Sequence, residues 1–246
     1  MITVSNLTKT FRDKKRGTVK AVDQLCLECR PGSVFGLLGL NGAGKTTTLR
    51  MLATMLRPDS GTANVAGFDL LEQPDDVRRR VGFLTGNTGL YLRLTGRETL
   101  RYFGQLQGLS RKTVEDRIER FSGLLSMADF IDVRVDKYST GMKQKISIAR
   151  TLIHDPPVLI LDEPTLGLDV LTSRAIVEFI RTAKTEGKAV IFSTHIMHEA
   201  AKLCDTIGVI HEGRMKKMAT LADLMRSYGT VDLDAIFVRI IEEPAV

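Results

Sequence analysis

The residues with the clearest chemistry form a glycine-rich loop near the start of the chain. The loop comprises Gly39, Leu40, Asn41, Gly42, Ala43, Gly44, Lys45, Thr46 and Thr47. Glycines let a backbone adopt positive φ and approach phosphates closely, so that amides and a following helix N-terminus bind negative charge. Lys45 would add a positive charge for the β- and γ-phosphates, and the Thr46 hydroxyl would ligate Mg²⁺. The loop therefore predicts a site for a nucleotide's phosphates.

Two adjacent acids predict what happens to that nucleotide. Asp162 and Glu163 directly follow the apolar run 158–161, so they stand at the carboxyl end of a predicted buried strand. Asp162 would hold Mg²⁺, directly or through water. Glu163 is placed to polarise an attacking water as a general base. The pair indicates hydrolysis.

Strands and helices on either side must position these groups. The apolar run 34–38 predicts a strand before the loop, and a helical pattern follows over 47–52 and ends near Arg57. Alternating residues in 2–11 and 19–29 predict strands of a small antiparallel sheet. Further strands are predicted at 62–66, 81–84, 158–161, 189–193 and 206–210.

Capping and periodicity predict the helices. Thr95 and Glu98 form a capping box that starts a helix ending near Gly108, and an amphipathic pattern follows over 112–125. Ser139 caps a third helix, which is predicted over 142–153. The remaining helical segments are predicted at 173–185, at 197–203 and in two short helices within 221–243. The result is an α/β core with helices inserted between its strands.

Composition limits the alternatives. The chain has 246 residues, 43% hydrophobic and 26% charged, which is typical of a soluble globular protein. It contains no apolar run of the ~18 residues that a membrane span needs, and we expect no secretion signal. The net charge is +6, and basic clusters at 12–16, 78–80 and 214–217 are predicted to be solvated faces. Cys26 and Cys29 lie three apart in a predicted strand, hence on opposite faces, which favours ordinary packing over a shared metal.

Taken together, the motifs resemble those of one family. After the loop come Tyr138-Ser139-Thr140-Gly141-Met142-Lys143-Gln144, Leu161-Asp162-Glu163-Pro164-Thr165, Leu166-Gly167-Leu168-Asp169 and Ser193-Thr194-His195. This order resembles the ATP-binding subunit of an ABC transporter over residues 2–220. The resemblance implies a P-loop NTPase core with a parallel-rich sheet, an N-terminal antiparallel β subdomain and an inserted α-helical subdomain. It implies an ATPase domain over 1–220, with the insertion at about 88–152, and a short helical extension over 221–246.

The resemblance also implies roles for individual residues. The nucleotide would be ATP with Mg²⁺, held on Thr46 and Asp162, and the catalytic residues would be Glu163, His195 and Lys45. Ser139, Thr140 and Gly141 occupy the family's signature position, which contacts the γ-phosphate held by the opposite subunit. Asp169 matches an acid at the dimer seam, and Phe11 stands where the family stacks an aromatic ring on adenine.

Two departures from the family pattern stand out. Tyr138, Thr140 and Met142 differ from the usual signature, and the β-branched Thr140 replaces a glycine where backbone approaches phosphate. Gly86 occupies the place of a glutamine that contacts Mg²⁺ in the family, so that either water fills the gap or Asn87 reaches in.

Within the family, the sequence around residues 83–91 and 138–145 is most similar to NatA-type ATPases of sodium exporters of the ABC-2 class and to daunorubicin-resistance ATPases. The resemblance implies a dimer of ATPase subunits at the cytoplasmic face of the membrane. It also implies a separate transmembrane permease, docked around residues 86–105. No nucleic acid is expected as a partner. The alternatives are a soluble ABC ATPase acting on ribosomes or nucleic acid, a kinase-like transferase, and a non-hydrolysing regulatory subunit.

Overall fold

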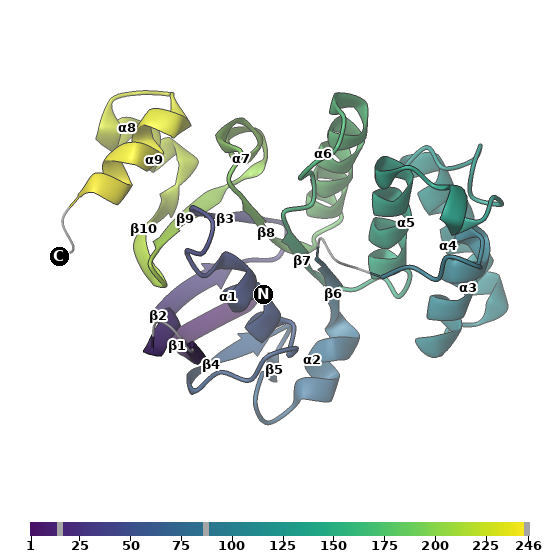
Figure 1. The fold of residues 1–246 in the computed structure, drawn as a ribbon, viewed down its shortest axis with the longest axis horizontal. Coiled ribbons are helices and arrows are strands. Elements are labelled where there is room, and N and C mark those ends of the chain that lie inside the picture. The colour runs from purple at the N-terminus through teal and green to yellow at the C-terminus, as the bar shows by residue number, and fades with distance from the viewer. Residues whose placement is uncertain (14–16, 86–88, 244–246) are drawn as a thin grey trace.

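The computed structural model describes residues 1–13, 17–85 and 89–243, and Figure 1 shows their fold. The strands are β1 (Ile2–Asp13), β2 (Gly17–Cys29), β3 (Val34–Leu38), β4 (Ser60–Val65), β5 (Phe68–Asp69), β6 (Val81–Leu84), β7 (Val158–Asp162), β8 (Ala189–Thr194), β9 (Thr206–His211) and β10 (Arg214–Thr220). The helices are α1 (Lys45–Leu52), α2 (Pro74–Arg80), α3 (Gly96–Leu106), α4 (Arg111–Leu124), α5 (Thr140–Leu152), α6 (Val170–Thr185), α7 (Met197–Leu203), α8 (Leu221–Tyr228) and α9 (Leu233–Glu242), with a 3₁₀ turn at Val135–Lys137.

The strands form two sheets. The four-stranded sheet has the order β2-β1-β4-β5 and is antiparallel, as the N-terminal alternation predicted. The six-stranded sheet has the order β10-β9-β3-β8-β7-β6. Strands β9, β3, β8, β7 and β6 run parallel to one another, and the edge strand β10 pairs antiparallel with β9. The predicted α/β fold with a parallel-rich sheet is confirmed.

The six-stranded sheet is covered on both faces, and successive residues of a strand enter different cores. Ile160 packs with Phe35 and Leu37 into a cluster shared with α1 and the four-stranded sheet. Its neighbours Leu159 and Leu161 pack into a second cluster with side chains of helices α3 through α9. Burial on both faces explains why the strand sequences are continuous apolar runs.

Two groups of helices lie at the two ends of the six-stranded sheet. In Figure 1, α3, α4 and α5 lie beyond β6, whereas α8 and α9 lie beside β9 and β10. The capping box is present, because the Thr95 side chain accepts from the Glu98 amide and the Glu98 carboxylate accepts from the Thr95 amide. The boundaries 88–152 and 221–246 stay predictions.

The structure corrects one local prediction and adds elements that the sequence patterns did not predict. Helix α1 ends at Leu52 rather than near Arg57, because Thr54 adopts a φ of 58°, which a helix cannot continue through. Arg78, Arg79 and Arg80 are exposed, as predicted, and they end α2, whereas residues 214–217 begin β10, a strand that the sequence patterns did not predict. Lysines are common on edge strands, where they discourage pairing with another chain, so the charge obscured the strand pattern.

Two further features bear on the predicted functions. Cys26 is exposed and Cys29 is buried, so they do lie on opposite faces of β2. Across the described ranges, none of the helices combines the length and the apolar character that crossing a bilayer requires.

Candidate functional site

The order of the six-stranded sheet brings three functional segments together. β8 lies between β3 and β7, and all three strands are parallel. The glycine-rich loop after β3, the acids that end β7 and the segment after β8 therefore meet at the carboxyl edge of the sheet. Open α/β sheets bind their ligands at this edge.

The glycine-rich loop packs its backbone against neighbouring strands. Gly44 caps α1 at a φ of 108°, and a Cβ on it would stand 2.4 Å from the backbone oxygen of Ala21. A Cβ on Gly39 would stand 2.5 Å from the backbone oxygen of Ile210. Gly42 has a φ of 80° but faces open space. Only glycine fits at Gly44 and Gly39, and the loop amides remain free of side chains that would block a phosphate.

A cavity of about 190 Å³ opens against this loop. Its lining consists of Ala21, Leu40, Asn41, Gly42, Gly44, Lys45, Thr46, Thr47, Glu163 and Leu166. The predicted loop and the predicted base therefore share one cavity. Gly39 and Ala43 are buried behind the lining residues. Ala21 and Leu166 complete the lining: Leu166 begins the motif that ends at Asp169, whereas no functional pattern pointed to Ala21.

Lys45 is held at the bottom of the site. It is 5% exposed, its Nζ donates to the Gly39 carbonyl at 2.7 Å, and it lies 3.3 Å from Glu163 Oε1. A buried ammonium group is costly unless oxygens pair with it, and these oxygens do so. The loop is thus prearranged around a positive charge.

Asp162 accepts two hydroxyl hydrogen bonds on the same oxygen. Thr46 Oγ1 donates to Asp162 Oδ1 at 3.1 Å, and Ser193 Oγ donates to it at 2.7 Å. The backbone amide of Glu163 donates to Ser193 Oγ at 3.1 Å. The fully buried Ser193 therefore orients both acids. Its signal was the Ser-Thr-His motif after a strand, but only the sheet order shows that it reaches Asp162.

The donor set around Asp162 fits Mg²⁺. Thr46 and Asp162 offer hard oxygen ligands, which Mg²⁺ prefers together with waters and phosphates. Over the residues that the structure describes, no three His, Cys, Asp or Glu side chains converge as a metal site. A bound Mg²⁺ would therefore take its other ligands from phosphate and water.

Glu163 and His195 contact one another. His195 Nδ1 lies 2.9 Å from Glu163 Oε2, and because a carboxylate only accepts, the ring nitrogen is the donor. Glu163 has a φ of 48°, a left-handed conformation that is uncommon for a residue with a side chain. Its side chain is 15% exposed and that of His195 is 40% exposed. The predicted base is thus shielded and oriented.

The predicted signature residues form a second group. Ser139 caps α5 by accepting from the Met142 amide, and Asp169 caps α6 by accepting from the Leu171 and Thr172 amides. Hydrogen bonds from the Thr172 amide and hydroxyl hold the pKa of Asp169 below its usual value. Gly141 adjoins this cap, since a Cβ on it would stand 3.0 Å from Thr172 Oγ1.

The signature residues and Asp169 are therefore close to each other but apart from the glycine-rich loop. Ser139, Thr140, Gly141 and Asp169 do not line the cavity at Lys45. Phe11 does not line it either: it lies on β1 opposite Val19, is 42% exposed, and has the Lys9 ammonium 5.9 Å from its ring centroid. The roles predicted for Ser139, Asp169 and Phe11 stay predictions. Gly86 and Asn87 lie outside the described residues.

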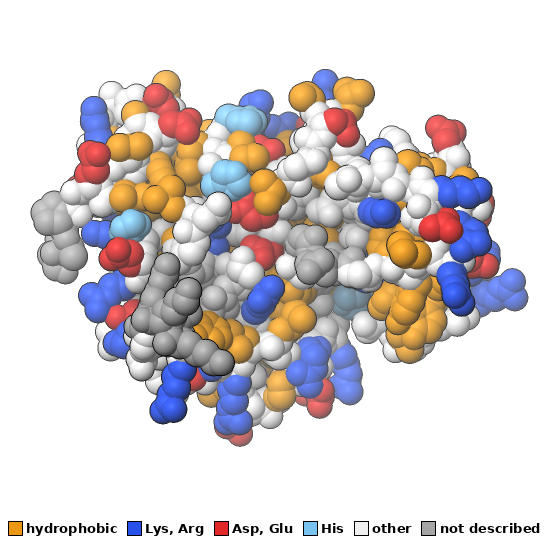
Figure 2. Space-filling view, viewed as in Figure 1, with side chains coloured by type: hydrophobic (Ala, Val, Ile, Leu, Met, Phe, Trp, Pro, Cys, Tyr) orange, Lys and Arg blue, Asp and Glu red, His pale blue; other side chains and the backbone are white. Residues whose placement is uncertain are grey.

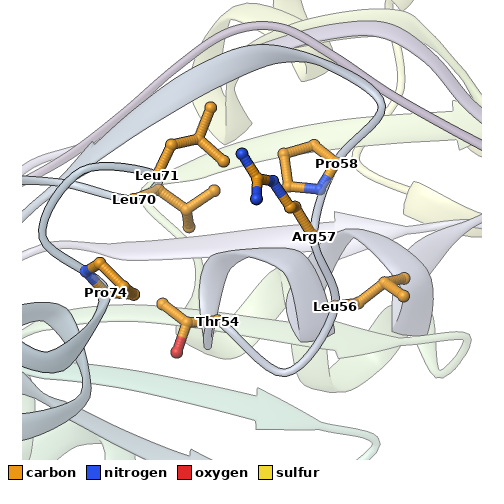
Figure 3. Close-up of a pocket in the computed structure, with 7 residues that line it drawn as sticks. All are labelled: Thr54, Leu56, Arg57, Pro58, Leu70, Leu71 and Pro74. Atoms are coloured by element: carbon orange, nitrogen blue, oxygen red, sulfur yellow. The ribbon is translucent and has the colours of Figure 1, made fainter.

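A second cavity, of about 140 Å³, lies beyond the carboxyl end of α1. Figure 3 shows its lining, Thr54, Leu56, Arg57, Pro58, Leu70, Leu71 and Pro74, with Arg57 extending between Leu71 and Pro58. The lining is apolar except for Thr54 and Arg57 and contains no acid. It offers no ligand set for a metal and no proton acceptor for hydrolysis.

A phosphate-binding loop, an Asp-Glu pair and a strand-end histidine at one sheet edge define a nucleotide-hydrolysing P-loop protein. The chain belongs to the ABC transporter family, whose model matches residues 22–166. It is accordingly an ABC ATPase, as its motifs predicted.

Relatives and solved structures agree with this assignment. The chain is 47% identical to the ABC transporter ATP-binding protein NatA of Bacillus subtilis, with 96% of each chain covered. It is 39% identical to the daunorubicin/doxorubicin resistance ATP-binding protein DrrA of Streptomyces peucetius, covering 93% of this chain and 68% of the relative. A solved ATP-binding subunit of an ABC transporter superposes with a TM-score of 0.88 at 30% identity, over 98% of this chain and 100% of that one.

Proposed function

We propose that this chain is the ATP-hydrolysing subunit of an exporter, and that two copies act with a separate permease at the cytoplasmic face of the membrane. The observation that carries the proposal is the position of Glu163, which lines the cavity together with Lys45 and contacts His195. The similarity to NatA and to the DrrA resistance protein supports the exporter class. The cargo, a sodium ion or a drug, stays a prediction.

The residues of one copy account for binding and proton transfer. Lys45 and the loop amides would bind the phosphates of ATP, and Thr46 and Asp162 would hold Mg²⁺. Bound Mg²⁺ would neutralise charge on the phosphate oxygens. Glu163 would accept a proton from the water that attacks the γ-phosphorus, and ADP would leave. His195 would hold the Glu163 carboxylate toward that water.

A second copy would complete each site. Ser139 and Asp169 lie at the starts of α5 and α6 and do not line the cavity of their own chain. A helix N-terminus binds anions, so Ser139 of one copy would face the γ-phosphate held by the other. The resemblance to the family supports this arrangement.

Complementation between two inactive variants tests the shared site. Ser139→Arg and Glu163→Gln should each abolish turnover alone. In a mixed dimer, one site combines an intact Glu163 with an intact Ser139 from the partner copy. If pairing is random and sites act independently, an equal mixture should recover about a quarter of the parent ATPase rate. Phosphate release against the mixing ratio is the measurement; a mixture as inactive as its components, when native mass spectrometry detects mixed dimers, would contradict the shared site.

The permease would dock beside α3. The exposed apolar side chains on this helix and just before it are Tyr91, Leu92, Tyr102 and Leu106. Figure 2 shows an orange area over the lower end of the helix. Tyr91 and Tyr102 meet edge to face at 5.5 Å. An exposed patch of this kind on a monomer marks a protein or membrane contact.

Co-purification separates the exporter from its alternative. An affinity-tagged chain should bring down a hydrophobic membrane protein from detergent extracts, and the double variant Tyr102→Glu/Leu106→Glu should lose it while keeping ATP binding. A matched variant, Val231→Glu, changes an apolar side chain that is 79% exposed and lies elsewhere, and should retain the partner. Ribosomes or nucleic acid in place of the membrane protein would favour the soluble ABC ATPase.

A further inference from the structure

A buried carboxylate outside the site described above accepts a short hydrogen bond. Glu199, in the first turn of α7, is 6% exposed, and Thr165 is 5% exposed. Thr165 Oγ1 donates to Glu199 Oε2 at 2.6 Å. A hydroxyl that donates to a carboxylate forms a strong, short bond, and nothing in the hydrolysis chemistry above uses this one.

The bond joins the two segments that carry the catalytic pair. Thr165 stands two residues after Glu163, and Glu199 stands four residues after His195. The same segments are already joined where Asp162 pairs with Ser193 in the sheet and where Glu163 contacts His195. The Thr165–Glu199 bond is the outermost of these three links. It fixes the first turn of α7 against the turn that follows β7.

That turn holds Glu163 in an unfavourable backbone conformation. A φ of 48° persists in a residue with a side chain only where its surroundings determine it. The Leu166 amide donates to the Glu163 carbonyl at 3.2 Å, and the Leu168 amide donates to the Thr165 carbonyl at 3.2 Å. These bonds shape the turn internally, whereas the Thr165 hydroxyl ties it to the segment of His195. The Thr165 hydroxyl is thus an additional link between the turn and the first turn of α7.

We propose that Thr165 and Glu199 are positioning residues for ATP hydrolysis, whose hydrogen bond keeps Glu163 and His195 in register. The proposal rests on the proposed function and adds to it the structural device that aligns the base. Neither residue lines the cavity at Lys45, so the bond acts on the chemical step and not on ATP binding. A displacement of about 1 Å at a reacting group can reduce a rate by about a hundredfold.

The test is a series at Thr165 with a matched control. Thr165→Val removes the hydroxyl at nearly constant volume, and we expect kcat to fall about tenfold while KM for ATP stays within about twofold. Thr165→Ser restores the donor and should return kcat to within about twofold of the parent. The control is Thr62→Val, because Thr62 donates to Asp69 at 2.9 Å in the antiparallel sheet, remote from the site. It should leave kcat and KM unchanged.

A double variant covers the case in which Thr165→Val folds poorly with an unpaired buried charge. Thr165→Val/Glu199→Gln removes that charge and should hydrolyse ATP as slowly as Thr165→Val, because both changes break one interaction. A double variant that hydrolyses ATP much more slowly than Thr165→Val would overturn the proposal. A parent-like kcat in Thr165→Val, or a kcat that Thr165→Ser fails to restore, would overturn it as well. A parent chain without Mg²⁺-dependent phosphate release would instead overturn the proposed function. Parent activity lost in Glu163→Gln but kept in Thr165→Val would overturn only the positioning role.

Discussion

Glu163→Gln should bind ATP, form dimers and barely hydrolyse. The amide has nearly the size of the carboxylate and can still contact His195, but it cannot accept a proton from water. Loss of a general base typically reduces a rate by about 10²–10⁴-fold. Neutralising Glu163 also removes a negative charge beside Lys45, which lies 3.3 Å away, so ATP binding should stay equal or tighten.

Three measurements on this variant separate chemistry from binding. Phosphate release should fall to near background, nucleotide titration should give the parent affinity or better, and sedimentation with Mg²⁺ and ATP should show a persistent dimer. Glu178→Gln serves as the control, because Glu178 is exposed on α6, where it pairs with Arg181. It should hydrolyse at the parent rate. Near-normal turnover in Glu163→Gln would remove the general-base role.

Gly44→Ala should disrupt the phosphate-binding loop from within. The new Cβ would stand 2.4 Å from the Ala21 oxygen, at a φ of 108° that alanine rarely adopts. Left-handed strain costs about 1–2 kcal/mol and overpacking about 1–3 kcal/mol, so the free energy of unfolding should fall by about 2–5 kcal/mol. Displaced amides should weaken ATP binding by about ten- to a hundredfold.

Gly42→Ala is the matched comparison. Its φ of 80° imposes the same kind of backbone strain, but a Cβ there meets no atom within 4 Å. We expect a loss of only about 1 kcal/mol in unfolding free energy. Thermal unfolding without nucleotide compares the two variants, followed by ATP titration. Equal melting temperatures would show that the contact with Ala21 does not constrain the loop.

Local sequence patterns predicted only part of the site. The loop at Lys45 and the acid pair at Asp162 could be identified from spacing alone, because each is a short continuous segment with its own chemistry. The structure brings both into one cavity. The pairings of Ser193 and Glu199 escaped prediction, since their partners stand 31 and 34 positions away in the chain and no periodicity reports such a pairing.

Local patterns likewise predicted only part of the fold. Apolar runs located the parallel strands, and the capping box located the start of α3, because burial and capping act within a few residues. Strand β10 was missed because its lysines occupy an edge position, where charge is an advantage and the apolar signal is weak. The early end of α1 was missed because only the backbone angle of Thr54 reveals it.

The amino-acid sequence by itself determined the class of protein, an ABC ATPase, and predicted its nucleotide site on a glycine-rich loop and an acid pair for hydrolysis. Those properties depend on residues adjacent in the chain. Only the tertiary structure decided that β8 separates β3 from β7 and so sets Ser193 against Asp162, His195 against Glu163 and Glu199 against Thr165. The physical reason is that strand order follows from how two buried faces pack, which is a property of the whole core.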